Sequence, residues 1–391
     1  MLRRVTVAGC PISLKDLSFG LLCLFNKTYQ GQLSDALLRL LDLKYVYLVN
    51  SGASSFYTIL KTLKDREGKD EVIVPAYTAP SLITVIRKAG LKPVLCDISL
   101  DDFNMDVNLL PAAVSEQTLC ILGVYMFGIV NKELQRLKRR FPHIFIIEDC
   151  AQSLGSKIDA TFVGNSADVS IFSFNRGKNL PTYGGGCIAT NSERVAEKII
   201  EEGQSISGPA MGQKVLIALK LLGLSLAVRP FIYGLGYRFI RRFKDVTLPK
   251  DFEVRRYSDF QAAVALSLLK KIEDFSEKRY NNGIKLIEGL RDVEGIILPK
   301  ISGNVRPAFN RLPIVIKDLG KRQEVEKALG KAGVDTSRMY LKPLHHIFDL
   351  GYKEQDFPAA SYFAERLLTL PVHPLLTDIQ LNRIIETVKN A

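Results

Sequence analysis

The stretch Ile146–Thr190 reads IIEDCAQSLGSKIDATFVGNSADVSIFSFNRGKNLPTYGGGCIAT and holds the most informative residues of the chain. Its first apolar run ends at Asp149, and a second run, VSIFSF, is followed four residues later by Lys178. Ligands bind at the carboxyl ends of the strands in open α/β sheets, so both side chains are expected at one site. Gly177 frees the backbone just before the lysine.

Short apolar runs alternate with helical stretches around this segment, from about residue 44 to residue 190. Strands this uniformly apolar are covered on both faces, which indicates an α/β fold with a mostly parallel seven-stranded sheet flanked by crossover helices. The predicted strands are Tyr45–Val49, Glu71–Val74, Pro93–Asp97, Cys120–Tyr125, Ile144–Glu148, Val169–Phe174 and Cys187–Thr190. The predicted helices are Ser54–Leu63, Ser81–Ala89 and Lys132–Phe141.

The length of 391 residues predicts two domains, because single hydrophobic cores rarely exceed about 250–300 residues. We expect a large domain over residues 1–250, with an insertion at about 206–250. A smaller C-terminal α+β domain is expected over residues 251–391, where Leu312–Ile316 reads as a strand and Lys321–Lys331 as a helix.

The composition is basic, with 53 lysines and arginines against 41 acidic residues and a net charge of +12. This charge favours phosphorylated substrates, nucleic acid or an acidic membrane surface, or it simply marks a basic soluble surface. No nucleic-acid recognition motif accompanies the cations, so a nucleic-acid partner is not expected. The six cysteines lack a C-x-x-C pair, which is typical of reduced thiols in a cytoplasmic protein. No residues have metal-ligand spacing and no signal peptide is read, so neither is predicted.

One segment is unusual: Val215–Lys244 begins VLIALKLLGLSLAV and ends in cations interleaved with aromatic residues. A membrane-spanning helix needs about 20 apolar residues, and Arg229-Pro230 breaks the run before that length. Apolar side chains beside clustered cations are typical of a membrane interface, so peripheral membrane contact is one hypothesis. A hydrophobic hairpin packed inside the protein or against a second subunit is the alternative, and a true span is the third reading.

Asp149 and Lys178 together suggest a specific chemistry. A lysine amine forms a Schiff base with an aldehyde, and a carboxylate holds a pyridinium nitrogen protonated. These are the two groups that pyridoxal phosphate (PLP) needs for its ring to act as an electron sink. Alone, either residue is more often a turn residue or a solvated charge, so the argument rests on the pair.

The motifs E-D-x-A-Q-x-x-G and x-F-S-F-x-x-x-K-N, followed by a glycine run, resemble the signature of the DegT/DnrJ/EryC1/StrS sugar-aminotransferase family. The resemblance covers nearly the whole chain apart from the unusual apolar segment, and it implies the fold of PLP enzymes of fold type I. Further matching stretches are SGAS (Ser51–Ser54), VIVPAYT (Val72–Thr78), KPVLCDI (Lys92–Ile98), SDFQAAVAL (Ser258–Leu266) and LPVHPLLT (Leu370–Thr377).

The resemblance implies roles for single residues. Lys178 would form the Schiff base and move a proton between the substrate Cα and C4′ of PLP, while Asp149 would bind the pyridine nitrogen. Gln152 would approach the ring face or its phenolic oxygen, and Ser173 would hydrogen-bond the phosphate.

The phosphate and ring positions depart from the family pattern. Ala53 and Ser54 would offer N–H groups at a helix start, where free donors bind phosphate, but the family usually has Thr at Ala53. The ring-stacking aromatic is missing after the P-x-x-T run, and Tyr77 is the candidate replacement. The family's N-x-R-M-S reads VRRYS here, so Arg255 or Arg256 is expected to bind phosphate in place of an asparagine that often reaches the partner subunit's cofactor.

The run YLKPLHH resembles the family's substrate-side loop, so Tyr340, His345 and His346 are candidate substrate contacts, with a structural role for the histidines as the alternative. The resemblance implies a homodimeric cytoplasmic transaminase that moves an amino group from L-glutamate to a nucleotide-linked keto-sugar for surface polysaccharide or lipopolysaccharide. Dehydratase relatives have His at the lysine position, and Lys178 argues against that activity. Two alternatives stay open: an aminotransferase at the inner membrane face acting on a lipid-linked substrate, and a non-catalytic PLP-fold regulatory protein.

Overall fold

The computed structural model describes most of the chain. It covers residues 4–9, 11–22, 28–64, 68–204, 206–240, 251–301 and 303–391, with side chains left out at 237–240. Cys10, Cys23 and the basic residues that close the unusual apolar segment, from Arg241 to Lys244, therefore lie outside the described residues. The other four cysteines are buried free thiols.

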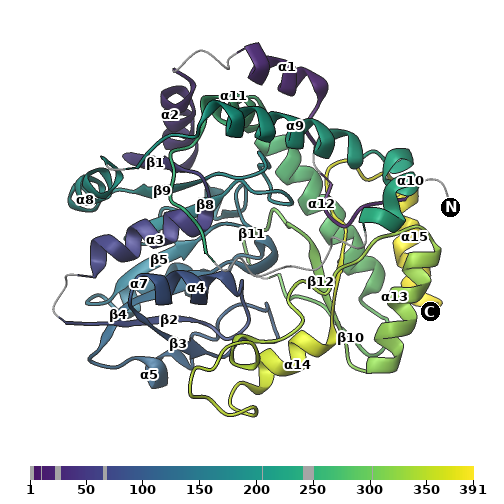
Figure 1. Cartoon of the computed structure of the whole chain (residues 1–391). Coiled ribbons are helices and arrows are strands. Elements are labelled where there is room, and N and C mark those ends of the chain that lie inside the picture. The colour runs from purple at the N-terminus through teal and green to yellow at the C-terminus, as the bar shows by residue number, and fades with distance from the viewer. Residues whose placement is uncertain are drawn as a thin grey trace.

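A seven-stranded sheet forms the centre of the molecule (Figure 1). Its strands are β1 (Tyr45–Val49), β2 (Glu71–Pro75), β3 (Lys92–Cys96), β4 (Thr118–Val124), β5 (Phe145–Asp149), β8 (Val169–Ser173) and β9 (Gly186–Thr190). Their order is β1-β9-β8-β5-β4-β2-β3. The five strands from β8 to β3 in this order run parallel, whereas β9 is antiparallel to both of its neighbours. The predicted mostly parallel seven-stranded sheet is confirmed.

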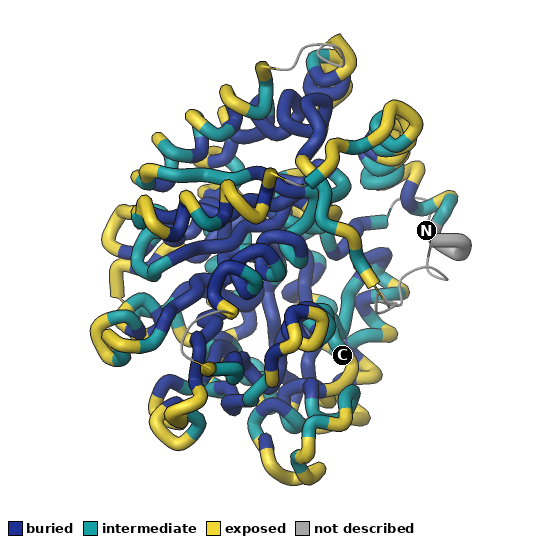
Figure 2. The backbone as a smooth tube through the Cα atoms, turned by 60° about the vertical axis from the view of Figure 1, so that its left-hand side comes forward, coloured by how far each residue is buried: buried dark blue, intermediate teal, exposed yellow. Residues whose placement is uncertain are grey.

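Helices cover both faces of this sheet because alternate strand residues are apolar toward each side. In β2, Val72 and Val74 belong to one hydrophobic cluster and Ile73 belongs to the other. Figure 2 shows the central strands buried and the exposed residues on the outer turns and helix faces. The first cluster includes α3 (Gly52–Leu63), α4 (Ser81–Lys88) and α8 (Glu193–Gln204), and the second includes α2 (Tyr29–Leu41) and α11 (Asp259–Leu269).

The single helix predicted over Lys132–Phe141 is wrong in detail. The chain forms two short helices, α6 (Lys132–Gln135) and α7 (Leu137–Arg140), after the short helix α5 (Leu110–Ala113). Arg136 interrupts them, and its N–H is shared between the carbonyls of Lys132 and Glu133, each at 3.1 Å. This tight turn redirects the chain before it enters β5.

The C-terminal part builds a second, antiparallel sheet of order β10-β12-β13. One hydrophobic cluster contains residues of both sheets, so the two parts share a continuous core. The predicted strand Leu312–Ile316 and the predicted helix near Lys321–Lys331 are both present, and the division at residue 250 stays a prediction. The elements are α12 (Ile272–Leu290), β10 (Ile296–Ile297), β12 (Leu312–Ile316), α13 (Leu319–Lys331), α14 (Pro358–Arg366), β13 (Leu367–Leu370) and α15 (Asp378–Lys389).

A small third sheet ties the two parts together. It has the order β11-β6-β7 and joins the C-terminal part to the chain that follows β5. Its strands are β6 (Lys157–Ile158), β7 (Thr161–Phe162) and β11 (Val305–Arg306).

The unusual apolar segment forms a bent helix pair, α9 (Met211–Ala227) and α10 (Pro230–Ile240). In Figure 1, α9 lies along the top of the molecule near α11 and α1 (Leu14–Leu22), and α10 turns away at its end. Within the described ranges, no single helix is long and apolar enough to cross a membrane. Met211–Ala227 and Pro230–Gly236 reach that length and composition only as a pair, with a bend of 101° between them.

Candidate active site

Asp149 and Lys178 follow neighbouring parallel strands of the large sheet. Asp149 is the last residue of β5 and lies beside Ile171 of β8 in the strand register. Its carboxylate is buried, and its Oδ1 accepts a hydrogen bond from the Ala151 N–H at 2.8 Å. Burial raises the pKa of this carboxyl group, while the Ala151 N–H and the nearby Lys178 amine lower it. A cation at this strand end would therefore stabilise the carboxylate form.

Lys178 lies in a tight turn after β8. Its N–H donates to the Asn175 carbonyl at 3.1 Å, and Gly177 has a φ of +78°, which favours glycine. Burial lowers the pKa of the Lys178 amine to about 8, with Asp149 opposing the shift and the nearby Arg311 adding to it. An amine with this pKa is partly neutral near pH 7, as a nucleophile must be.

A buried asparagine pair fixes the lysine turn. Asn310 donates to the Gly177 carbonyl through Nδ2, and its own N–H donates to the Phe127 carbonyl at 2.7 Å. Asn179, next to the lysine, donates to the carbonyls of Leu154 and Ala308 at 2.9 and 2.8 Å. The segment before β12 is thus bound to the lysine turn. The role of Asn310 was not predictable from local sequence, because its partners lie more than 130 positions earlier.

Arg311 is a second residue that the sequence pattern did not reveal. Its side chain lies against Gly177, and a Cβ built on that glycine would meet Nη2 at 3.5 Å. Within the described part of the chain, Nε has no hydrogen-bond partner and no carboxylate forms an ion pair with the guanidinium; Nη1 contacts the Met339 sulfur. Burial lowers the pKa of Arg311, and Tyr340 and Asp335 raise it. A cation beside Lys178 is therefore available to an anion.

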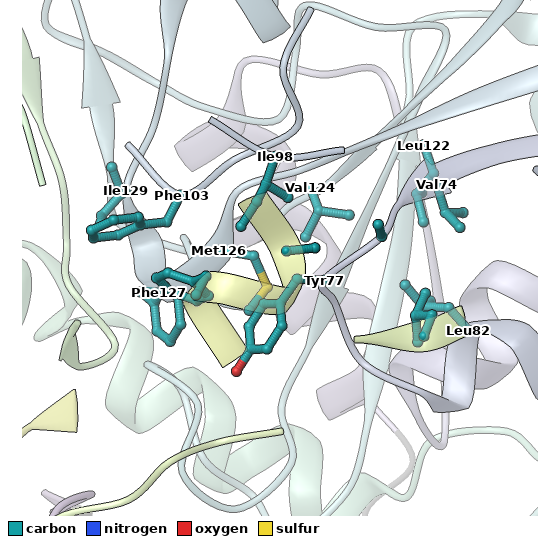
Figure 3. Packing of buried hydrophobic residues seen from close by; sticks show 14 of the residues in the cluster. Val74, Tyr77, Leu82, Ile98, Phe103, Leu122, Val124, Met126, Phe127 and Ile129 are labelled. Atoms are coloured by element: carbon teal, nitrogen blue, oxygen red, sulfur yellow. The ribbon is translucent and has the colours of Figure 1, made fainter. Parts of the chain in front are cut away.

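Tyr77 is fully buried and holds the loop that carries Tyr340. Its hydroxyl donates to the Tyr340 carbonyl at 3.1 Å and accepts from the Tyr340 N–H at 3.2 Å. The Tyr77 ring packs edge-on against Phe363 with centroids 4.8 Å apart, and Figure 3 shows it beside Met126 with the hydroxyl pointing away from the apolar cluster. The ring-stacking role of Tyr77 stays a prediction. Tyr340 itself is partly buried, and its pKa is raised to about 12 by burial, with Arg311 opposing.

Gln152 lies buried just after β5 and contacts the turn that follows β4. Its Oε1 accepts the Phe127 N–H at 3.2 Å, and its Nε2 contacts the Met126 sulfur at 3.4 Å. Phe127 has a φ of +59°, so the amide contact supports a turn that few non-glycine residues adopt. Contact between Gln152 and a cofactor ring stays a prediction.

The start of α3 faces the end of β8. Ser51 is the N-cap and accepts the Ser54 N–H at 3.0 Å, while the Ser54 hydroxyl donates to Asn50 Oδ1 at 2.7 Å. Gly52 lies so close to Ser173 that an added Cβ would meet the serine Cβ at 3.0 Å. First-turn N–H groups such as that of Ala53 have no acceptor within the helix, so they are available to an anion. The Ser54 hydroxyl is already engaged in the cap.

Arg255 and Arg256 lie beside this turn without reaching Lys178. Arg255 forms an ion pair with Glu253 and donates to Gln213 of α9 at 2.8 Å. Its N–H also donates to Asn50 Oδ1 at 3.0 Å. Arg256 is exposed and lies at an isolated bridge to β1. Phosphate binding by either arginine stays a prediction.

The two predicted histidines lie in a separate loop. His345 and His346 both approach the Glu354 carbonyl, at 3.2 and 3.0 Å, and their rings contact each other with centroids 4.1 Å apart and planes tilted by 58°. The hydrogen bonds and ring contacts of both histidines are made within this loop, and none of them involves Lys178 or Asp149. Substrate contact by the histidines stays a prediction. Across the described ranges, no three His, Cys, Asp or Glu side chains form a cluster able to hold a metal.

The residues brought together fit PLP. A buried carboxylate, an amine of lowered pKa and a helix start facing a serine match the pyridine nitrogen, the aldehyde and the phosphate of that molecule. The fit rests on Asp149, Lys178, Ser173 and the first turn of α3.

Comparison with known proteins finds relatives that match most of the chain. A sequence model described as the DegT/DnrJ/EryC1/StrS aminotransferase family matches residues 25–389. The spore coat polysaccharide biosynthesis protein SpsC of Bacillus subtilis is 28% identical, over 89% of this chain and 85% of that protein. GDP-perosamine synthase of Escherichia coli O157:H7 is 26% identical, over 88% of this chain and 85% of its own. The crystal structure of a DegT DnrJ EryC1 StrS aminotransferase from Brucella abortus has a TM-score of 0.76 at 24% identity, covering 96% of this chain and 94% of that chain.

Proposed function

The chain belongs to the DegT/DnrJ/EryC1/StrS aminotransferase family, and on this premise we propose that it moves an amino group from L-glutamate to a nucleotide-linked keto-sugar. It is a PLP-dependent transaminase. The observation that carries the proposal is the pair formed by the Lys178 amine, with a pKa of about 8, and the buried Asp149 carboxylate. They follow neighbouring strands at one edge of the sheet.

Lys178 and Asp149 take the two central roles in this proposal. When bound, PLP supplies an electron sink for negative charge at the amino-acid Cα. The Lys178 amine would hold the cofactor aldehyde and, once released from it, would move the proton at Cα, for which a pKa near the working pH is favourable. The Asp149 carboxylate keeps the pyridine nitrogen protonated, and the ring cation gives this buried carboxylate a partner.

The phosphate of the cofactor is assigned to the start of α3. The N–H groups of Gly52 and Ala53 point out of the first helical turn, and the Ser173 hydroxyl lies next to Gly52. The Ser54 hydroxyl donates to Asn50, so its contribution is to shape the turn. The hydroxyl contact that the family usually has at Ala53 is missing from this arrangement.

We assign the α-carboxylate of the amino donor to Arg311. The guanidinium lies beside the lysine turn and has no ion pair with the residues that the structure describes. Partly buried cations are costly unless an anion pairs with them. The α-carboxylate is bonded to Cα, the carbon that reacts beside Lys178. Because Arg311 also lies beside Lys178, its guanidinium would be close to this carboxylate.

The acceptor is proposed to be a nucleotide-linked keto-sugar of a surface polysaccharide or lipopolysaccharide pathway. The names of two relatives support this acceptor: GDP-perosamine synthase and the spore coat polysaccharide biosynthesis protein SpsC. The net charge of +12 favours a substrate that bears a diphosphate.

A second candidate is an acceptor linked to a membrane lipid, with the protein at the inner face of the membrane and otherwise cytoplasmic. It is favoured by the exposed apolar side chains of α9 and α10. The start of α9 is connected to the cofactor side of the molecule, because Gln213 accepts from Arg255, which in turn donates to Asn50.

We also propose a homodimer, as the family resemblance implies. The Glu253–Arg255 segment lies beside the helix start assigned to phosphate and lines an open cavity of about 490 Å³ with Tyr57 and Lys88. Light scattering of the purified protein is expected to give twice the chain mass. A fully active monomer would refute this part of the proposal.

The decisive test is an absorbance spectrum of the purified protein with PLP, before and after L-glutamate. A visible cofactor band that glutamate converts to the pyridoxamine form supports the transaminase half-reaction. Lys178→Ala must abolish the borohydride-trapped adduct, whereas exposed Lys270→Ala must keep it. Failure to bind supplied PLP would favour the remaining alternative, a non-catalytic regulatory protein of the PLP fold.

A further inference from the structure

Helices α9 and α10 present a large apolar surface without a partner in the described chain. Only Leu221 and Ser225 are buried along the 17 residues of α9. Eight large apolar side chains of the pair are between 39% and 62% exposed, which is unusual for a globular protein. They are Met211, Val215, Leu216, Leu219, Leu222, Phe231, Ile232 and Leu235.

These side chains form one continuous outward face on each helix. At 100° per residue, the five exposed apolar residues of α9 fall within an arc of roughly 140°. They are Met211, Val215, Leu216, Leu219 and Leu222. The opposite side of α9 contacts the body of the protein, where Gln213 binds Arg255. The apolar face is therefore directed away from the fold and does not belong to its core.

The charge of this segment has one sign only. From residue 203 to residue 244 the sequence contains no aspartate or glutamate and seven cations, which is more than half of the net charge of +12. Four of them lie between Met211 and Ile240, and one of these, Arg229, is exposed at the bend between the two helices. The cations are Lys214, Lys220, Arg229, Arg238, Arg241, Arg242 and Lys244.

We propose that α9 and α10 form a docking surface for a lipid bilayer rich in anionic headgroups. The apolar faces would lie at the level of the acyl chains and the cations at the headgroups, as in interfacial helices. The bend of 101° keeps the pair in the interface, since neither helix alone is long enough to cross.

The charge pattern favours a bilayer over a second copy of the chain. A symmetric dimer contact places the same patch of both subunits face to face, so Lys214, Lys220 and Arg229 of one copy would meet the same cations of the other. No acidic residue within this segment compensates them. An anionic bilayer neutralises the same cations while it buries the apolar side chains.

The docking surface is anchored to the body of the protein at both helices. Besides the Gln213 contact in α9, buried Tyr233 of α10 donates through its hydroxyl to Asp335 at 2.7 Å. Membrane binding would therefore carry the active site with it without unfolding either helix. This inference does not depend on the proposed reaction, because vesicle binding and amino transfer are measured separately and fail separately.

Flotation of the purified full chain with vesicles tests the proposal. Vesicles of phosphatidylcholine alone are compared with vesicles containing phosphatidylglycerol, at low and high salt. The protein is expected to float with the anionic vesicles at low salt and to be released by salt, since each cation near the surface favours binding roughly fivefold. Replacing Leu219 and Leu222 together by Glu is expected to weaken binding by more than about tenfold. The matched control is Leu109→Glu, an exposed apolar residue beside α5.

Each variant is first checked for the cofactor band and for its thermal unfolding midpoint, because the replaced side chains are exposed and the fold should remain. Sedimentation of the wild type apart from anionic vesicles would overturn the proposal. It would also be overturned if the double variant bound vesicles as well as the wild type. A third overturning result is a wild-type dimer that becomes monomeric in the double variant while neither protein binds vesicles, because the surface would then contact a second copy.

Discussion

Arg311→Met is expected to raise the pKa of Lys178 above its value of about 8. Burial is the largest cause of the lowered pKa, and the Arg311 guanidinium adds to it. At pH 7 a lysine with a pKa of 8 is about one tenth neutral, which is roughly 300 times the neutral fraction of an ordinary lysine. Removing the guanidinium leaves only burial to depress the pKa, so the neutral fraction at pH 7 falls.

Asp149→Asn is a matched variant that is expected to shift the pKa of Lys178 in the opposite direction. The Asp149 carboxylate raises the pKa of the Lys178 amine, so its removal is expected to lower that pKa below 8. Competitive labelling of the PLP-free protein with acetic anhydride between pH 6 and 11 measures both shifts. Mass spectrometry then quantifies the peptide that contains Lys178, and the readout does not require activity.

Three results would refute this reasoning. The first is a Lys178 titration near pH 10 in the wild type, which would mean that the amine is solvated. The second is an unchanged midpoint in Arg311→Met, because the two cations would then be too far apart to interact. The third is a shift of the same sign in both variants, which would point to a general change in burial and not to the two charges.

Two further predictions concern the surroundings of the lysine turn. Gly185→Ala is expected to destabilise the fold by about 2 kcal/mol or more, because Gly185 has a φ of +104° and a Cβ would come within 2.2 Å of the Tyr257 ring. Urea unfolding checks this against Gly223→Ala in α9, where a Cβ meets nothing and a small gain is expected; equal midpoints would contradict it. Asn310→Ala should cost about 1–3 kcal/mol and weaken PLP binding, because it frees the Gly177 carbonyl. Unchanged calorimetric affinity for PLP would show that the turn holds without it.

The large sheet was predictable because its strands are short and apolar, and its central strands are buried. Strand boundaries moved by a residue or two, and β5 extends through Asp149 where the prediction ended at Glu148. The broken helix at Arg136 was not predictable, since the residues on both sides of it favour a helix. Local patterns therefore specify the helices and strands, while the turns between them depend on the position of the next element in the fold.

The candidate site was predictable where local sequence carries two chemical groups in one motif, as at Asp149 and Lys178. Arg311 was not, because an arginine before an apolar strand looks the same in sequence whether it lies on the surface or beside a lysine. The Tyr77 hydroxyl contacts backbone 263 positions away. Such pairings depend on the complete fold, which periodicity does not reveal.

The pairing of the first strand has a consequence for synthesis on the ribosome. β1 lies at the edge of the large sheet, where it pairs with β9. Tyr45 can therefore form its strand contact only after Thr190 has been synthesised. Val5, at the start of the described chain, pairs with Val334. The N-terminal segment therefore emerges early but docks only when most of the polypeptide has been translated. Until then its apolar residues depend on the rest of the nascent chain, or on a chaperone, for protection from aggregation.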